Sequence, residues 1–204
     1  PSKVCGNQTE FFVWKNDELA QIQPVDLVKF DNLKKVAIID CGVKQNIIRE
    51  VAKRGFVAVV VPPNIKFEKF MKLEPVGVLV SNGPGDPRDY TYIQQLLKEI
   101  LNYSLEETNN LPVFGICLGH QLLACVLGAE VYKMTFGNRG ANQPVQNTLN
   151  QQAFLTYQNH SYAVRTETIP AGWESLFVKQ NDGSVECLRH KTKPIFSVQF
   201  HPEA

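Results

Sequence analysis

The most informative segment of the chain is Leu111-Pro-Val-Phe-Gly-Ile-Cys-Leu-Gly-His-Gln-Leu-Leu-Ala-Cys-Val-Leu127. Its short apolar run predicts a buried strand over 113–116, and the helical spacing of the later apolar residues predicts a helix over 118–127. Cys117 stands where the strand turns sharply into the helix, and Gly115 and Gly119 leave the backbone room for that turn. The sequence therefore predicts a strand–turn–helix unit with a cysteine at its corner.

The residues before this unit repeat the same alternation. Apolar strands are predicted over 36–40, 56–61 and 76–80, and helices over 45–54, 66–73 and 92–101. Strands that alternate with helices favour an α/β fold with a doubly wound, mostly parallel sheet and helices on both faces. We expect Gly42, Gly83 and Cys117 to converge, because each follows a strand and sites gather at the carboxyl ends of parallel strands.

After Gly128 the sequence pattern no longer alternates between strands and helices. Short strands are predicted over 130–134, 153–157, 176–179, 185–188 and 195–200, and turns rich in Asn, Gln and Gly separate them. This half predicts an antiparallel extension of the first sheet.

Cys117 has the features of a nucleophile. At a helix N-terminus the free N–H groups and the helix dipole stabilise a thiolate at neutral pH. The N–H of Leu118 is placed to bind the oxyanion that forms when a carbonyl is attacked. The alternative is a buried core cysteine, which is the usual role of a free Cys, and the turn makes it the weaker interpretation.

His201-Pro-Glu203 supplies what a cysteine nucleophile needs, namely a base and a carboxylate to orient it. The loop Gly83-Pro-Gly-Asp-Pro87 follows a parallel strand and could donate a second N–H to an oxyanion, although it could also be an ordinary tight turn. The residues thus indicate a Cys-His-Glu hydrolytic site. They leave a protease, an amidase and a thioesterase open.

Composition excludes other classes. The chain has 204 residues and a formal net charge of +1, so its charge balance calls for neither nucleic acid nor an anionic membrane. It has no apolar run of the ~18 residues that span a membrane and no signal peptide. The five cysteines include no C-x-x-C pair, which argues against disulfides and a metal site and favours the cytoplasm. Residues 1–33 are expected to be a linker or tail of an upstream domain, and residues 34–204 to be the enzyme domain.

Two segments, Phe114–Ala124 and Val198–Ala204, resemble the signature of class I glutamine amidotransferases. Within that family the chain is most similar to the eukaryotic, pyrimidine-type glutaminases of carbamoyl-phosphate synthetases. The similarity covers residues 36–204 and is carried by further segments: Asp40–Arg49, Val78–Pro87, Phe136–Val145 and Gln158–Val164.

The resemblance implies a flavodoxin-like amidotransferase fold and a mechanism. Cys117 would attack the side-chain amide of glutamine to form a γ-glutamyl thioester. His201 would protonate the departing ammonia and then activate water, and Glu203 would orient His201. The N–H groups of Gly83 and Leu118 would form the oxyanion hole.

The resemblance also implies a set of contacts and partners. Five residues would hold the glutamine: Gly85, Gln121, Asn159, Ser161 and Tyr162. The family often has Gly where Ser161 stands. The ammonia would pass to a carbamoyl-phosphate synthetase domain or subunit that uses ATP, bicarbonate and Mg, so this domain itself would need no cofactor and no metal. A family helix after the His-Pro-Glu strand and most of an N-terminal domain would be missing.

Two alternatives stay open at this stage. One is a non-catalytic docking module that regulates a synthetase. The other is the glutaminase of a different biosynthetic amidotransferase, such as that of anthranilate or GMP synthesis, although the Phe136-Gly-Asn-Arg-Gly segment argues against it.

Overall fold

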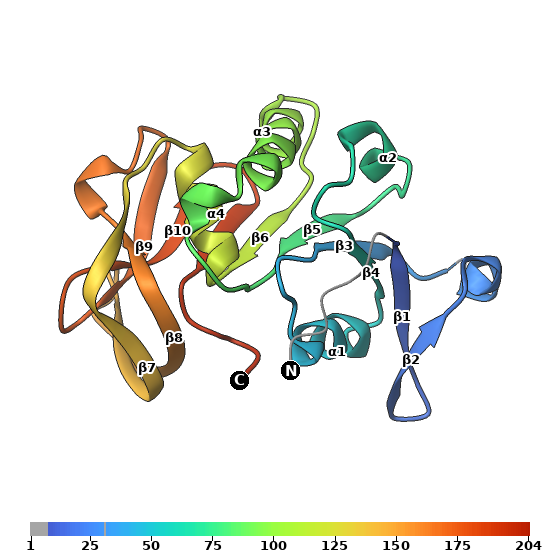
Figure 1. The fold of residues 1–204 in the computed structure, drawn as a ribbon, viewed down its shortest axis with the longest axis horizontal. Coiled ribbons are helices and arrows are strands. Elements are labelled where there is room, and N and C mark those ends of the chain that lie inside the picture. Colours follow the sequence, from blue (N-terminus) through green and yellow to red (C-terminus); the bar gives the residue numbers. More distant parts are fainter. Residues whose placement is uncertain (1–7, 31) are drawn as a thin grey trace.

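Five parallel strands form the centre of the molecule (Figure 1). The structure is a computed structural model that describes residues 8–30 and 32–204. The parallel strands lie in the order β4-β3-β5-β6-β11, with bounds β3 (Lys35–Ile39), β4 (Val57–Val61), β5 (Gly77–Val80), β6 (Val113–Ile116) and β11 (Ile195–Val198). Every residue of β4 is buried, as expected for a parallel strand with both faces covered.

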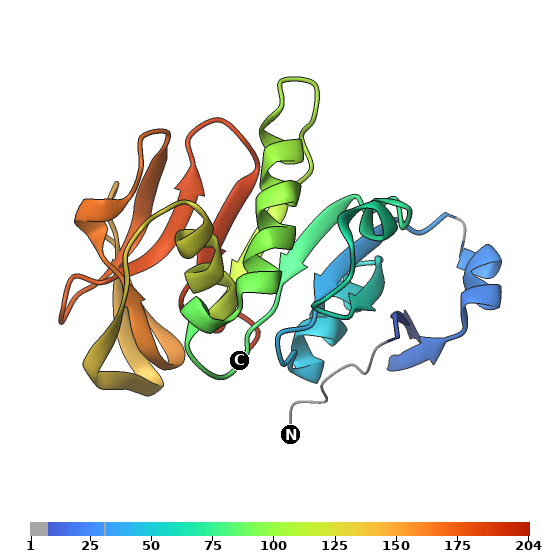
Figure 2. The same cartoon turned by 45° about the horizontal axis from the view of Figure 1, so that its top comes forward.

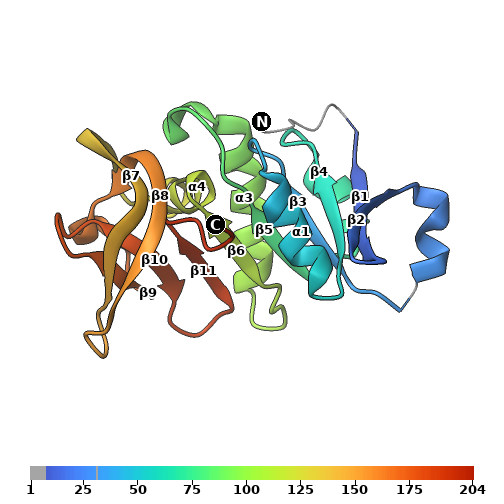
Figure 3. The same cartoon turned by 90° about the horizontal axis from the view of Figure 1, so that it is seen from below.

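Helices cover both faces of these strands. Helix α1 (Gln45–Lys53) packs on one face, where Ile47 and Ile48 meet Val60. Helices α2 (Phe67–Met71), α3 (Thr91–Leu105) and α4 (Leu118–Val126) pack on the other face, in the cluster that contains Val59 and Leu122. Figure 2 shows α3 and α4 in front of the sheet, and Figure 3 shows α1 in front of β3 and β4. The predicted strand over 113–116 and the helix that follows it are confirmed.

Antiparallel strands extend the sheet on both sides. Beyond β11 come β10 (Val185–His190), β9 (Trp173–Lys179), β7 (Val131–Asn147) and β8 (Ala153–Val164). Beyond β4 lie β1 (Glu10–Lys15) and β2 (Glu18–Ile22), followed by the 3₁₀ segment η1 (Pro24–Phe30). The sheet is therefore mixed: parallel pairing is confined to its centre, and the antiparallel extension expected after Gly128 lies beyond β11.

The N-terminal hairpin was expected to be connecting chain. Instead Phe11 pairs with Val59 of β4, and Phe11 and Val13 are buried in the core. The continuous apolar run Phe11-Phe-Val-Trp14 was its signal, but contact with β4 is what places the hairpin on the sheet. Whether residues 1–33 belong to an upstream domain stays a prediction.

Strand β11 differs from the sequence expectation in direction. Its residues were grouped with the antiparallel half, yet β11 runs parallel to β6, with Ser197 opposite Gly115 and Val198 opposite Ile116. Both strands therefore end at the same edge of the sheet. The residues that follow β11 lie beside Cys117, which follows β6.

Two short 3₁₀ segments, η2 (Pro87–Asp89) and η3 (Thr166–Thr168), complete the described elements. No helix in the described ranges is long and apolar enough to cross a membrane.

Helix α4 lies unusually close to strand β5. A Cβ atom on Gly119 would stand 2.2 Å from the carbonyl oxygen of Val80, which is backbone and cannot move aside. We expect Gly119→Ala to lower the free energy of unfolding by roughly 1–3 kcal/mol, the usual cost of overpacking. Urea denaturation measures this cost. In Gly77→Ala the new methyl group would meet its nearest atom at 3.8 Å, so that control should keep its midpoint, and equal midpoints for the two variants would contradict the packing argument.

Candidate active site

Cys117 occupies a strained corner between β6 and α4. Its φ of 53° and ψ of −101° lie in a region that non-glycine residues rarely adopt, at a cost of order 1–3 kcal/mol. The neighbouring backbone holds the corner: the N–H of Cys117 donates to Val198 O at 2.9 Å, and Gln121 N–H donates to Cys117 O at 3.2 Å. Strand β11 and the first turn of α4 thus fix where the sulfur points.

His201 and Glu203 form a buried pair beside this corner. The His201 N–H donates to Tyr157 O at 2.9 Å, and ring Nδ1 donates to Glu203 Oε1 at 2.8 Å. Their side chains are only 3% and 4% exposed. With Nδ1 committed to the carboxylate, the lone pair of the neutral ring is on Nε2. Burial acts to raise the pKa of Glu203, but the hydrogen bond and charge of His201, a backbone hydrogen bond and the charge of Lys44 together outweigh it, so the pKa is lowered and the carboxylate is ionised at neutral pH.

Helix α1 supports this pair from the other side of the site. The side-chain amide of Asn46 donates to the backbone carbonyl of Glu203, and Arg49 Nη1 donates to Asn46 Oδ1 at 2.8 Å. Lys44, just before the helix, lies 3.8 Å from Glu203 Oε1 and 3.4 Å from His201 Nδ1. Lys44 and Asn46 were not among the site residues predicted from the sequence. Both follow the carboxyl end of β3, a position that could have marked them as candidates.

The loops after β3 and β5 interlock, as their positions predicted. Asn82 Oδ1 accepts from the Lys44 N–H at 3.2 Å, and Asn82 Nδ2 donates to Gly42 O at 3.2 Å. A Cβ on Gly83 would stand 1.9 Å from the Cys41 oxygen, so only glycine fits there. Gly42, Gly83 and Cys117 line one cavity, which confirms the predicted convergence.

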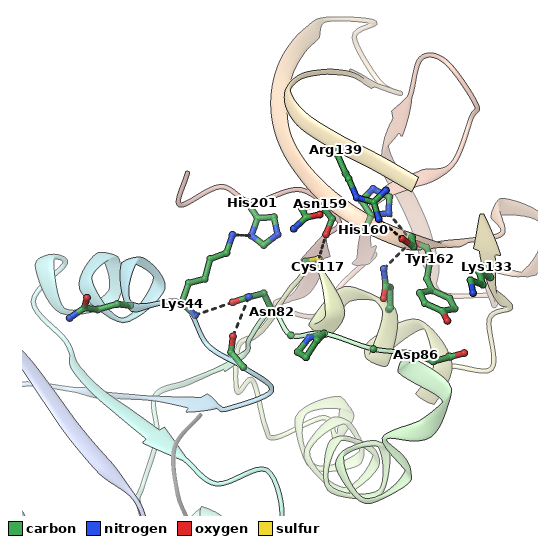
Figure 4. Close-up of a pocket in the computed structure, with 17 residues that line it drawn as sticks. Lys44, Asn82, Asp86, Cys117, Lys133, Arg139, Asn159, His160, Tyr162 and His201 are labelled. Carbon is green, nitrogen blue, oxygen red and sulfur yellow. Dashed lines mark hydrogen bonds between the residues drawn. The ribbon is translucent and has the colours of Figure 1, made fainter. Parts of the chain in front are cut away.

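The cavity has a volume of about 860 Å³, and Cys117 is one of the residues that line it (Figure 4). Most of the predicted site residues line it: Cys117, His201, Gly83, Gly85, Gln121, Asn159, Ser161 and Tyr162. Two predicted residues do not. Glu203 lies behind His201, and the side chain of Leu118 is buried in the core while its N–H donates toward the thiol.

Three cations in this cavity escaped the sequence analysis, namely Lys44, Lys133 and Arg139. Arg139 Nη2 donates to Ser161 Oγ at 2.9 Å, so this hydroxyl holds the guanidinium near the cavity. Because β7 was expected to end at 134, Arg139 was not placed on a strand beside β8. In the structure β7 extends past Arg139, which pairs with Asn159 of β8.

The thiol itself differs from expectation. Burial raises the pKa of Cys117 to about 12, and this outweighs the opposing effects of the Leu118 N–H and the Lys44 charge. Its Sγ contacts the Asn159 carbonyl oxygen, as donor, at 3.9 Å. Without substrate the residue is therefore a thiol and not the thiolate that the helix terminus suggested. The proton has to leave during the reaction, and the lone pair of His201 is the base suited to take it.

The four cysteines in the described ranges, Cys41, Cys117, Cys125 and Cys187, are free, and Cys5 lies outside those ranges. No group of three or more His, Cys, Asp or Glu residues among residues 8–30 and 32–204 is arranged to hold a metal ion.

A family model described as glutamine amidotransferase class-I matches residues 37–204. The chain belongs to the class I glutamine amidotransferase family. This amidotransferase resembles the solved structure of a putative GMP synthase protein from Thermoplasma acidophilum. The TM-score is 0.71 at 22% identity, covering 84% of this chain and 85% of that one. At that identity the likeness shows the fold.

Relatives of higher identity bear other names. The carbamoyl phosphate synthase small chain of Methanocaldococcus jannaschii is 47% identical over 170 residues, which are 83% of this amidotransferase chain and 46% of the relative. The mitochondrial carbamoyl-phosphate synthase [ammonia] of Aquarana catesbeiana is 46% identical over 173 residues, 85% of this chain and 11% of that protein. The chain thus spans about half the length of the small chain, and far less of the larger relative.

The raised pKa of the Cys117 thiol can be tested in the substrate-free protein. Alkylation of Cys117 by iodoacetamide should rise about tenfold per pH unit from pH 7 to 10, because the thiolate fraction keeps growing below a pKa of about 12. Peptide mass spectrometry of the substrate-free protein measures the rate at this residue. An unfolded peptide with the same cysteine is the control, and its rate should level off above its ordinary pKa of about 8.5. A plateau for Cys117 below pH 9 would refute the buried thiol.

Proposed function

We propose that this chain is a glutaminase that hydrolyses the side-chain amide of L-glutamine to glutamate and ammonia. One observation carries the proposal: Cys117, at a strained corner, shares a cavity with His201, whose Nδ1 is held by the buried carboxylate of Glu203. This arrangement suits attack on a small carbonyl group, and membership of the amidotransferase family selects the amide of glutamine.

The reaction has two halves. His201 Nε2 takes the proton of the Cys117 thiol as the sulfur attacks the amide carbon. The tetrahedral intermediate collapses, the C–N bond breaks, and His201 gives the proton to the departing ammonia. Water then attacks the γ-glutamyl thioester, with His201 as base, and glutamate leaves with the thiol restored. Glu203 stabilises the imidazolium that forms in each half.

The remaining predicted residues have roles in binding. The N–H groups of Gly83 and Leu118 would bind the oxyanion, and such donors typically contribute 10²–10³-fold in rate. Gly85, Asn159, Ser161 and Tyr162 would hold the glutamine. Gln121 would hold it through Oε1, since its Nε2 donates to Tyr162 O and Gln199 Oε1.

We further propose that the ammonia passes to a carbamoyl-phosphate synthetase, in a pyrimidine or arginine route, that uses ATP, bicarbonate and Mg. The names of the more similar relatives support this proposal. One relative of similar identity specifies ammonia in its name, so identity alone does not assign glutamine use. The nucleophile Cys117, present with its base and carboxylate, is what favours glutamine here.

The same proposal covers organisation. Residues 1–33 would connect to an upstream domain, and residues 34–204 would be the amidotransferase domain. The parallel strands would be the doubly wound, flavodoxin-like part of the family fold, and the enzyme would act in the cytoplasm without a cofactor of its own. The alternatives are a docking module and the glutaminase of another synthetase.

Replacement of the nucleophile tests the reaction. Cys117→Ser should abolish glutamate release, by at least about 10³-fold, because a serine hydroxyl is a far weaker nucleophile at this site. Cys187→Ser is the matched control, since Cys187 is also buried but lies away from the cavity, and it should retain activity. Glutamate release is measured by coupled assay. Retained release in Cys117→Ser would refute the mechanism and favour the docking module.

Reconstitution tests the partner. Addition of the synthetase component of a carbamoyl-phosphate synthetase should raise the rate of glutamate release and yield carbamoyl phosphate from glutamine, bicarbonate and ATP. The synthetase components of GMP and anthranilate synthesis are the controls and should have no effect. Activation by one of them instead would overturn the choice of partner without touching the glutaminase mechanism.

A further inference from the structure

A layer of polar side chains is buried beneath the wall of the cavity. Three members, Thr156, Gln158 and His160, alternate along the inward face of β8, where a strand normally presents apolar residues. Lys179 of β9 and Glu186 of β10 face them. Gln158 and Glu186 are 0% exposed and Lys179 is 2% exposed. Such groups are costly to bury unless they are hydrogen-bonded, so their arrangement calls for an explanation.

The layer forms a connected chain of hydrogen bonds. Glu186 Oε2 accepts from Gln158 Nε2 at 2.8 Å, and Gln158 Oε1 lies 3.1 Å from His160 Nε2. His160 Nδ1 lies 2.8 Å from the backbone oxygen of Tyr162. Lys179 Nζ also donates to Gln158 Oε1, at 3.2 Å. Gln158 is therefore held at both ends of its amide, and through it Glu186 is linked to the backbone of β8.

Backbone pairing is interrupted on each side of this part of β8. The ladder between β7 and β8 is regular from Asn138–His160 to Gly140–Gln158, and a register irregularity separates this stretch from the regular pairing before it and after it. Strand β8 is also at the edge of the sheet, so of the described strands β7 is the one that pairs with it; the backbone N–H of His201 bonds Tyr157 O, just before this part of the strand. Because side chains alternate along a strand, a small shift would turn cavity residues away from the site.

This part of β8 is also the part that meets the nucleophile. Asn159 lies between Gln158 and His160, and its carbonyl oxygen is the group that the Cys117 Sγ contacts. Gln121 of α4 donates to Tyr162 O at 2.9 Å from the opposite side. The wall Asn159–Tyr162 is thus held from α4 on one side and from β10, through Gln158 and His160, on the other.

We propose that Glu186 is a positioning residue for the glutamine site: by accepting from Gln158 it holds the wall Asn159–Tyr162 in register with Cys117. The proposal rests on the proposed glutaminase function for its kinetic consequence. Glu186 touches no cavity atom and acts only through Gln158 and His160. Its other oxygen, Oε1, has no hydrogen-bond partner among the described residues, so the bond from Gln158 is the hydrogen bond that ties this carboxyl group to β8, beside the charge interaction with Lys179.

The acceptor atom, and not the charge, is the required feature. Burial raises the pKa of Glu186 to about 8 and lowers the pKa of His160 to about 4. The layer therefore does not depend on an ion pair between Glu186 and His160 near neutral pH. An amide at position 186 keeps an oxygen for Gln158. Glu186→Gln should therefore preserve the wall, whereas Glu186→Met, similar in size but without an acceptor, should release it.

Kinetics of the full-length protein test the proposal. Glu186→Met should raise KM for glutamine about tenfold and change kcat less than threefold, because the wall binds substrate while Cys117 and His201 stay in place. Glu186→Gln should restore KM to within about twofold of the parent. Glu174→Met is the matched control, since Glu174 lies on the neighbouring strand β9 and pairs with Arg189 at 2.7 Å, outside the layer. It should leave KM unchanged.

Amide hydrogen exchange provides a second readout without substrate. Exchange at residues 159–162 should be faster in Glu186→Met than in the parent, Glu186→Gln or Glu174→Met. An unchanged KM and unchanged exchange in a folded Glu186→Met protein would overturn the proposal, as would a Glu186→Gln variant as impaired as Glu186→Met. If the parent releases no glutamate, the proposed function fails, and the exchange measurement still decides the role of Glu186.

Discussion

The parallel pairing of β6 with β11 is the contact on which the rest of the site depends. Cys117 follows β6 and His201 lies just beyond β11, so the shared direction of the two strands brings nucleophile and base to one edge of the sheet. The bond from the Cys117 N–H to Val198 O belongs to the same pairing and holds the strained corner. If β11 ran antiparallel, the residues after it would lie at the opposite edge, and Cys117 would have no base.

Close packing and burial then set the chemistry. Glycines at 83 and 119 let backbone segments approach to distances that a side chain would forbid, and this draws the loops after β3 and β5 over the corner. The resulting burial keeps Cys117 protonated and makes the Glu203 carboxylate costly unless His201 donates to it. A thiol in this state has to lose its proton before the sulfur can attack a carbonyl group, and the oriented imidazole of His201 is the base beside it.

The antiparallel extension has a different task. Strand β8 supplies Asn159, Ser161 and Tyr162 to the cavity, but it is an edge strand whose pairing with β7 is interrupted by register irregularities. The buried polar layer and the hydrogen bond from Gln121 compensate for this. Residues of the parallel centre thus carry the proposed chemistry, and residues of the extension carry the proposed binding of substrate.

The local units of the fold could be predicted from the chain alone. The apolar run before Cys117 and the helical spacing after it were sufficient for strand, corner and helix, because those signals depend on near neighbours in the chain. The His-Pro-Glu segment likewise identified base and carboxylate. Four features could not be predicted without the folded structure: the direction of β11, the N-terminal hairpin on β4, the protonation of Cys117, and the presence of Lys44 and Arg139 in the cavity. Each depends on contacts between residues distant in sequence, or on the burial that those contacts create, and neither leaves a periodic pattern in the chain.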